Sequence, residues 1–445
     1  MMRTSLAVIV LALAALPAFG GSDAKPGDRI AIAKAFVAAQ VKGDFAAAMK
    51  EFDDVMKKAS PADKMEATWK LVQKQVGPFQ KQLGTRQEKT EKYDIVYVTC
   101  QFEKMPLDVR VVFTKGGQIT GYQFRPVQKK YEFKPPSYAR PDSFRESAVT
   151  VGMGEWALPG TLALPTGEGP FAAVALVHGS GAHDRDETIG PNKPFRDLAW
   201  GLASQGIAVL RYEKRSKEHG AKMAALKDKL TFKEDVVDDA LAAAALLRKR
   251  KEIDKKRIFV LGHSLGAFVG PQIGLDDPEL RGLILLAGNT RPLEDLILDQ
   301  VTYILSLRGE LGNAEKAELD KIKKQVLRVK DAKLTRDTPA SELPLDTPAA
   351  YWLALRDHRP MEVVAQFRRP ILVLQGERDY QVTMADFEGW KKALGARKDV
   401  RLKSYPKLNP LFMAGEGKAK PAEYEKAGHV AQEVVDDIAR WIKEN

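Results

Sequence analysis

A serine flanked by two glycines is the clearest chemical signal in the sequence. Gly262-His263-Ser264-Leu265-Gly266 follows an apolar run at 258–261 and leads into a helical pattern. A G-x-S-x-G at such a place predicts a cramped strand-to-helix turn, at which the flanking positions have no room for a side chain. The turn presents the Ser264 hydroxyl as a nucleophile and aims the Leu265 amide at a developing oxyanion. An ordinary strand-to-helix turn is the alternative, and the flanking strand and helix favour the catalytic interpretation.

A serine hydroxyl attacks a carbonyl carbon efficiently only when a base takes its proton and an acid orients that base. Asp379 directly follows the apolar run 371–374 and is the predicted acid, with Glu377 as the weaker candidate. The only histidine beyond Asp379 is His429, which lies just before an amphipathic helical pattern. His429 is therefore the candidate base, and a purely structural role at the start of that helix is the simpler alternative.

The elements that must position these residues alternate between buried strands and helices. From about residue 145 onward, helical patterns separate short apolar runs, at 172–177, 207–211, 258–261, 283–287 and 371–374. Apolar strands separated by helices predict an α/β fold, in which a mostly parallel sheet is covered on both faces. Ligands of such sheets bind at the carboxyl ends of the strands.

The alternation is interrupted at about 290–368 by largely helical sequence that is too long for a loop. This insertion predicts a helical lid above the strand ends. Its aromatic residues Tyr303, Tyr351 and Trp352 are candidates for lining a substrate pocket, although packing is the more common role of such residues.

The N-terminal part of the chain has a different pattern. Residues 29–83 are helical in pattern, and a period of two then predicts three antiparallel strands, at 95–102, 107–114 and 118–125. We predict a small α+β domain at 25–125, a proline-bearing linker at 126–144 and the larger domain at 145–445.

Residues 1–21 have the pattern of a secretory signal peptide, with Arg3, the apolar run 6–16 and small residues after Pro17. The pattern predicts export to the periplasm or the extracellular space. No later segment is long and apolar enough to span a bilayer. The single cysteine, Cys100, excludes an intramolecular disulfide and is predicted to lie in a core.

The surface is predicted to be basic but not specialised for nucleic acid. The chain has 70 Lys and Arg against 59 Asp and Glu, a net charge of +11. No nucleic-acid-binding module is apparent, so a solvated cationic surface is the simpler interpretation.

From about residue 145 to the end, these features together resemble the α/β-hydrolases, close to the dienelactone-hydrolase-like and acyl-esterase branch. Residues 177–186 resemble the H-G-S-G loop of such esterases, which implies a second oxyanion donor from the backbone of Ser180 or Gly181. The order serine, acid, histidine also matches this fold. The N-terminal domain resembles NTF2-like accessory domains, for which a docking or structural role is expected.

The chain departs from that family at the base. Relatives commonly carry the base in a Leu-Asn-His-Leu-Phe segment, whereas this chain reads Leu408-Asn409-Pro410-Leu411-Phe412. A proline can neither accept the Ser264 proton nor donate a ring N–H to Asp379. The resemblance therefore leaves the base position empty at Pro410, and His429 would have to replace it from elsewhere in the chain.

We thus expect an exported serine hydrolase that cleaves small carboxylic esters through an acyl-enzyme, without metal or cofactor. Thioester and peptide substrates are alternatives on the same fold. A catalytically degenerate hydrolase that acts as a binding or scaffold protein is the alternative of another class. A metal site at His183, Asp184 and Asp186 is disfavoured, because an ion-paired loop explains those residues. The acyl and alcohol specificity and the oligomeric state do not follow from the sequence.

Overall fold

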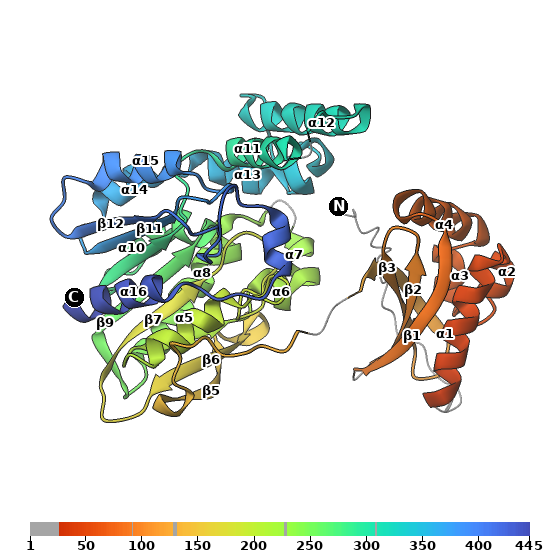
Figure 1. The fold of residues 1–445 in the computed structure, drawn as a ribbon, viewed down its shortest axis with the longest axis horizontal. Coiled ribbons are helices and arrows are strands. Elements are labelled where there is room, and N and C mark those ends of the chain that lie inside the picture. Colours follow the sequence, from red (N-terminus) through yellow and green to blue (C-terminus); the bar gives the residue numbers. More distant parts are fainter. Residues whose placement is uncertain (1–25, 91, 128–130, 227–228, 308) are drawn as a thin grey trace. The chain divides into compact units, whose positions relative to one another are not determined.

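The computed structural model describes residues 26–445 except 91, 128–130, 227–228 and 308. The chain divides into two compact units, which meet along the chain at residues 130 and 131 (Figure 1). The predicted signal peptide at 1–21 lies outside the described residues. Within the described residues, no helix is both long and apolar enough to cross a membrane.

In the described residues of the N-terminal unit, four helices pack against one face of an antiparallel sheet of order β1-β2-β3-β4. Alternate residues of β2 and β3 enter the core, where Trp69 meets Phe102 and Phe124, and Cys100 is fully buried among them. The elements of this unit are α1 (Pro26–Val41), α2 (Phe45–Ala48), α3 (Asp54–Ala59), α4 (Ala62–Val76), β1 (Phe79–Lys89), β2 (Asp94–Phe102), β3 (Pro106–Phe113) and β4 (Ile119–Pro126). The predicted helices and three strands are confirmed.

The expectation that helical sequence extends to residue 83 is wrong, because β1 begins at Phe79. This strand pairs with β2 alone at the edge of the sheet, and its register shifts twice near its start. Its side chains are mostly exposed and show no regular apolar alternation. Backbone pairing to β2 rather than a hydrophobic pattern therefore makes it a strand.

The second unit is built on an eight-stranded sheet of order β12-β11-β10-β9-β7-β8-β6-β5, in which β7 to β12 run parallel and β6 pairs antiparallel with both β5 and β8. Its strands are β5 (Phe144–Val151), β6 (Leu158–Pro165), β7 (Phe171–Val177), β8 (Ala208–Tyr212), β9 (Ile253–His263), β10 (Gly282–Leu286), β11 (Ile371–Gly376) and β12 (Val400–Tyr405). The predicted α/β class is confirmed. The chain order reverses between the neighbours β7 and β9, which makes a crevice at their carboxyl ends.

Helices cover both faces of this sheet. α5 and α16 pack on one face, and α8, α10, α14 and α15 contribute to the core on the other. The helices of this unit are α5 (Pro194–Ala203), α6 (Arg215–Glu218), α7 (Gly220–Leu226), α8 (Asp238–Arg248), α9 (Leu265–Phe268), α10 (Gly270–Asp276), α11 (Leu293–Ser306), α12 (Asn313–Lys330), α13 (Ala349–Asp357), α14 (Pro360–Gln366), α15 (Met384–Leu394) and α16 (Gln432–Glu444). A π-helical turn, η4 (Lys233–Val237), leads into α8.

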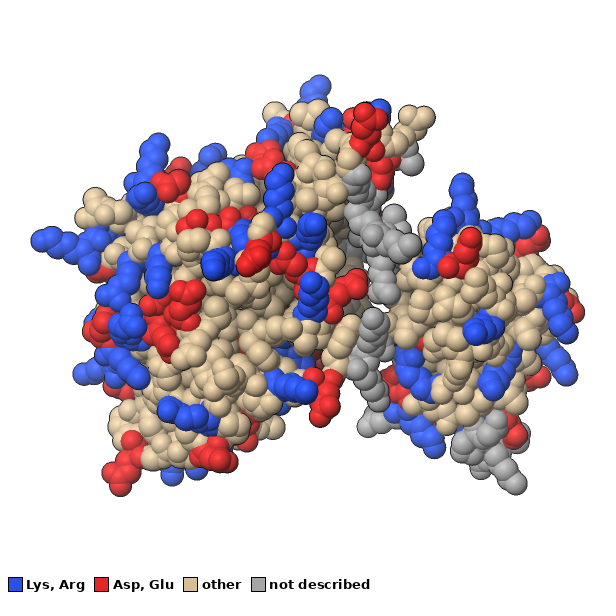
Figure 2. All heavy atoms as spheres, in the orientation of Figure 1, with Lys and Arg blue, Asp and Glu red and all other residues tan. Residues whose placement is uncertain are grey.

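The helical insertion is present as predicted, and α11, α12 and α13 gather at one end of this unit (Figure 1). The later part of the predicted linker belongs structurally to the second unit. Phe133 lies edge-on to Trp200, and the Tyr138 hydroxyl donates to the Val430 carbonyl at 2.8 Å. On the face shown in Figure 2, acidic and basic side chains are interspersed.

Candidate active site

Ser264 stands at a strained turn between β9 and α9. Its backbone has φ 52° and ψ −114°, in a region that residues with a side chain rarely adopt. The two flanking glycines are required by space: a Cβ on Gly262 would lie 2.2 Å from the Gly266 oxygen, and one on Gly266 would lie 2.3 Å from the Val177 oxygen. Leu265 is the first residue of α9, where helix N–H groups lack an intrahelical partner.

The loop after β7 lies against this turn. A Cβ built on Gly179 would be 3.3 Å from the Ser264 Cβ, so the two segments are in contact. The loop is held from both sides, because the Gly179 N–H donates to Glu187 Oε1 at 2.8 Å and its carbonyl accepts from the buried Lys214 ammonium at 2.9 Å. Of the two donors predicted in this loop, Ser180 lines the same cavity as Ser264, whereas Gly181, with φ 104°, is not among the residues that line it.

Asp379 follows β11 and faces the same cavity as Ser264. Its Oδ1 accepts the backbone N–H groups of Gln381 at 2.7 Å and Val382 at 2.9 Å, which fix the carboxyl group. Burial raises the pKa of Asp379 to about 7 from an ordinary 3.8, although these two hydrogen bonds oppose the rise. The alternative acid, Glu377, is bonded to the Ser404 hydroxyl at an exposed position and does not line the cavity.

The base position of the family motif is occupied by Pro410, which lines the cavity together with Ser264 and Asp379. Its carbonyl lies 3.1 Å from His263 Nε2. The side chain of Asn409 shapes this turn, since its Oδ1 accepts the N–H groups of Leu411 and Met413. The structure therefore brings the serine, the acid and a proline together where a serine, an acid and a histidine would be needed.

The structure does not bring His429 to this cavity. Its Nδ1 lies 3.0 Å from the buried Asp197 carboxylate of α5, and its ring lies edge-on to Phe133. The hydrogen bond to Asp197 raises the pKa of His429. Asp197 also accepts the Val430 N–H, and this second bond fixes the chain just before α16. The position of His429 therefore fits the simpler alternative, a structural role at the start of α16.

A second histidine, His263, lies beside Ser264 but is locked in a buried ion pair. His263 Nδ1 and Glu187 Oε2 are 2.9 Å apart, close enough for an ion pair although the N–H is not aligned as a hydrogen bond. Burial lowers the pKa of His263, but Glu187 and the Pro410 carbonyl outweigh burial and raise it to about 9. Burial alone would raise the pKa of Glu187, but His263 outweighs burial and lowers this pKa to about 2. His263 therefore stays protonated at neutral pH and cannot accept the Ser264 proton.

One ring nitrogen of each of the other four histidines is also engaged. All six histidines lie among the described residues. Besides His263, whose Nε2 contacts the Pro410 carbonyl, four have an Nε2 atom that contacts a backbone carbonyl, namely His178, His183, His219 and His358. Among these four, only His183 lines the cavity, and its Nε2 is 2.7 Å from the Ser180 carbonyl. Within the described part of the chain, Ser264 Oγ has no hydrogen-bond partner.

The cavity that contains Ser264 has a volume of about 190 Å³. The helical insertion supplies an apolar wall, formed by Leu293, Leu296 and Ile297 of α11 and by Leu345. Polar side chains also line the cavity, namely Gln300 of α11 and, from other segments, Asn289 and Gln381. The aromatic residues predicted to line it do not: Tyr351 and Trp352 are buried in the core, and the Tyr303 hydroxyl donates to the Ala419 carbonyl.

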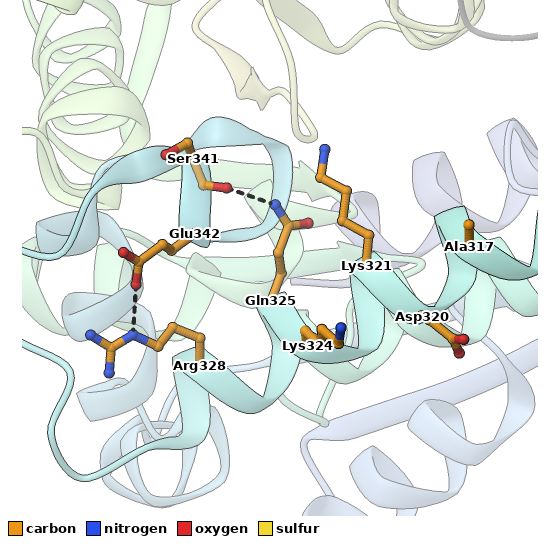
Figure 3. Close-up of a pocket in the computed structure, with 8 residues that line it drawn as sticks. All are labelled: Ala317, Asp320, Lys321, Lys324, Gln325, Arg328, Ser341 and Glu342. Carbon is orange, nitrogen blue, oxygen red and sulfur yellow. Dashed lines mark hydrogen bonds and ion pairs between the residues drawn. The ribbon is translucent and has the colours of Figure 1, made fainter. Parts of the chain in front are cut away.

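A larger hollow, of about 600 Å³, lies on the lid between α12 and residues 340–342 (Figure 3). Across it, Gln325 bonds the Ser341 carbonyl and Arg328 bonds Glu342. None of the predicted site residues lines it. The smaller cavity around Ser264 is therefore the candidate active site.

Sequence reasoning missed Glu187, which anchors the oxyanion loop and holds His263. The loop around it is ion-paired as expected, since Asp186 contacts Lys193 and Arg211. No group of three or more His, Cys, Asp or Glu side chains that could hold a metal is found in the described parts of the chain. The only signal for Glu187 was its place seven residues after the predicted donor Ser180.

Comparisons with known proteins agree with this architecture. A family model described as "Serine aminopeptidase, S33" matches residues 168–409, and a model described as a protein of unknown function matches residues 33–122 of the N-terminal unit. The chain is 36% identical over 407 residues to Esterase EstD of Thermotoga maritima, which covers 92% of this chain and 93% of that protein.

Solved structures show weaker likeness. Est1E of Butyrivibrio proteoclasticus matches 67% of this chain and 96% of its own at 15% identity and a TM-score of 0.41. A dienelactone hydrolase of Anabaena variabilis matches 68% of this chain and 98% of its own at 17% identity and a TM-score of 0.40. The family model and the Thermotoga relative carry the assignment, and the chain belongs to the α/β-hydrolase family described as serine aminopeptidase S33.

Proposed function

We propose that this chain hydrolyses small carboxylic esters through an acyl-enzyme formed on Ser264. The observation that carries the proposal is the strained backbone of Ser264, with φ 52°, at a turn that faces a cavity. Strain of this kind costs of the order of 1–3 kcal/mol and persists where the surrounding structure enforces it. Here two glycines with no room for a Cβ enforce it, so the hydroxyl is presented at the cavity.

The proposed roles follow from placement. Ser264 attacks the carbonyl carbon, and the backbone N–H groups of Leu265 and of Ser180 or Gly181 stabilise the oxyanion. Asp379 is the acid that would orient a base. The name of the Thermotoga relative, an esterase, supports ester substrates, and the small, partly apolar cavity fits a small acyl group. Thioesters and peptides remain the alternatives on this fold, and the family description favours the peptide among them.

Slow turnover is part of the proposal, because Pro410 occupies the base position. Loss of a triad member costs several orders of magnitude, while roughly a thousandfold acceleration persists from the oxyanion hole and binding. The same observation favours a second candidate function, in which the cavity binds a ligand without turning it over. We also propose export, which rests on the pattern of residues 1–21 alone.

Covalent labelling tests the nucleophile. The purified protein is incubated with a fluorophosphonate, and the modified residue is identified by mass spectrometry. We expect an adduct on Ser264 in the wild type and in the control Ser306→Ala, which removes an exposed hydroxyl at the end of α11, and none in Ser264→Ala. Absence of any adduct on Ser264, even after prolonged exposure, would contradict the proposed nucleophile.

A further inference from the structure

The carboxyl group of Asp379 is only half satisfied. Its Oδ1 accepts two backbone N–H groups, whereas the one contact of its Oδ2 within the described residues is to Gln375 Nε2 at 3.4 Å. The same amide group also donates to the Val382 carbonyl at 2.8 Å and to the Gly376 carbonyl at 3.1 Å. Its two N–H groups are therefore already used, and its hydrogen bond to Oδ2 is weak. Asp379 is 6% exposed, and a buried carboxylate oxygen without a good donor is costly.

The neighbouring groups do not supply the missing donor. Pro410 lies in the same cavity and has no N–H, and its carbonyl is already engaged by His263. His263 in turn is held by Glu187. At about 190 Å³, the cavity exceeds the roughly 30 Å³ that one water takes up in the liquid, so a small ring has room beside Ser264.

We propose that the corner between Ser264, Asp379 and Pro410 binds a ligand's nitrogen base that also carries an N–H group, of which imidazole is the simplest case. The N–H donates to Asp379 Oδ2, and the second nitrogen faces Ser264 Oγ. The proposal rests on Ser264 being the nucleophile. It adds the class of ligand: a small imidazole, either free or carried by the ester itself.

Besides the ester and water, the reaction requires only the nitrogen base. The ring nitrogen takes the Ser264 proton while the Oγ–C bond forms, and the resulting imidazolium is held by Asp379. The tetrahedral oxyanion is stabilised by the backbone N–H groups of Leu265 and of Ser180 or Gly181. When the ester C–O bond breaks, the imidazolium returns its proton to the leaving alcohol. Water then attacks the acyl-enzyme by the same steps, and the base is released unchanged.

The first arm tests free bases through the rate of Ser264 phosphonylation by a fluorophosphonate, a readout that base-catalysed ester hydrolysis in solution does not affect. Imidazole should accelerate labelling of the wild type at least tenfold and with saturation. 1-Methylimidazole accepts a proton but has no N–H for Asp379, so it should give at most a tenth of that effect. Asp379→Asn should abolish the saturable acceleration, with its folding verified by thermal unfolding.

The second arm tests a base carried by the substrate. Hydrolysis of N-acetyl-histidine methyl ester is compared with that of N-acetyl-phenylalanine methyl ester, which has a ring but no base, and Ser264→Ala gives the background. We expect at least a tenfold preference for the histidine ester. A free base that accelerates labelling without such a preference supports the site and assigns it to a separate small molecule.

Three results would overturn the proposal. If imidazole has no effect on the wild type while Pro410→His labels rapidly, the corner binds no base, yet Ser264 remains the nucleophile. If the wild type labels rapidly without imidazole and His183→Ala abolishes this, the chain holds its own base. If neither the wild type nor a folded Pro410→His labels under any condition, the proposed function fails together with the inference.

Discussion

The buried pair of Glu187 and His263 should be a main electrostatic support of the elbow, and Glu187→Gln isolates it. Glutamine keeps an oxygen for the Gly179 N–H but removes the charge that His263 needs. The side chains are 1% and 12% exposed, so water cannot replace the lost carboxylate. Lowering the Glu187 pKa from 4.5 to about 2 on folding corresponds to roughly 3 kcal/mol of stabilisation of the folded state. Removing one partner of a buried ion pair costs about 3–5 kcal/mol. We therefore expect Glu187→Gln to lower the free energy of unfolding by about that amount.

The loss should depend on pH. Because the pKa of Glu187 is lowered by folding, its contribution is complete above about pH 4.5 and is lost as the pH falls through about 2. Because the pKa of His263 is raised, its contribution is complete below about pH 6.5 and is lost as the pH rises through about 9. The pair is therefore strongest between about pH 4.5 and 6.5.

Urea unfolding followed by tryptophan fluorescence measures the loss of unfolding free energy in Glu187→Gln, since five of the six tryptophans lie in the second unit. The control is Glu444→Gln, which breaks an exposed pair with Arg401 and should cost less than about 1 kcal/mol. A Glu187→Gln variant that costs no more than this control at about pH 5.5 would contradict the expected support by the pair. An equal loss at about pH 5.5 and 9.5 would also refute it.

Three further outcomes are expected. Gly262→Ala should lower the melting temperature by many degrees in thermal unfolding, because its Cβ meets backbone at 2.2 Å, whereas Gly220→Ala, with open space around it, should be near neutral. In urea unfolding, Asp379→Asn should stabilise the protein by up to roughly 4 kcal/mol above pH 7 but not at pH 4. The reason is that the buried carboxyl group, whose pKa is raised to about 7, becomes costly to keep in the folded state as the pH rises between those values. His429→Ala should cost about 1–3 kcal/mol through the unpaired Asp197 and leave Ser264 labelling unchanged; loss of labelling in the folded variant would identify His429 as the base.

The parts of the site that local spacing determines could be predicted from the sequence. The glycines around Ser264 and the short turn after β11 act through their immediate neighbours, and the structure places Ser264, Ser180 and Asp379 in one cavity. The alternation of apolar strands and helices likewise predicted the sheet, and its interruption at about 290–368 predicted the helical insertion. The prediction was weaker at β1, where backbone pairing at an edge replaces a hydrophobic pattern.

Contacts between distant segments could not be predicted in this way. His429 is 232 residues from Asp197 along the chain, and the pair that holds it outside the cavity has no sequence signal. The same is true of Glu187 with His263 and of the leucines that line the cavity in place of the predicted aromatics. Each depends on how elements pack, which spacing within one element does not reveal.

The central claim is that a proline occupies the place of the base in an otherwise assembled hydrolase site. Its most direct test is the rate of p-nitrophenyl butyrate hydrolysis by the wild type, Pro410→His and Pro410→Gln, the last of which removes the proline without adding a base. We predict that Pro410→His is at least a hundredfold faster than both others, because a triad member contributes several orders of magnitude. A folded Pro410→His no faster than Pro410→Gln would contradict the claim.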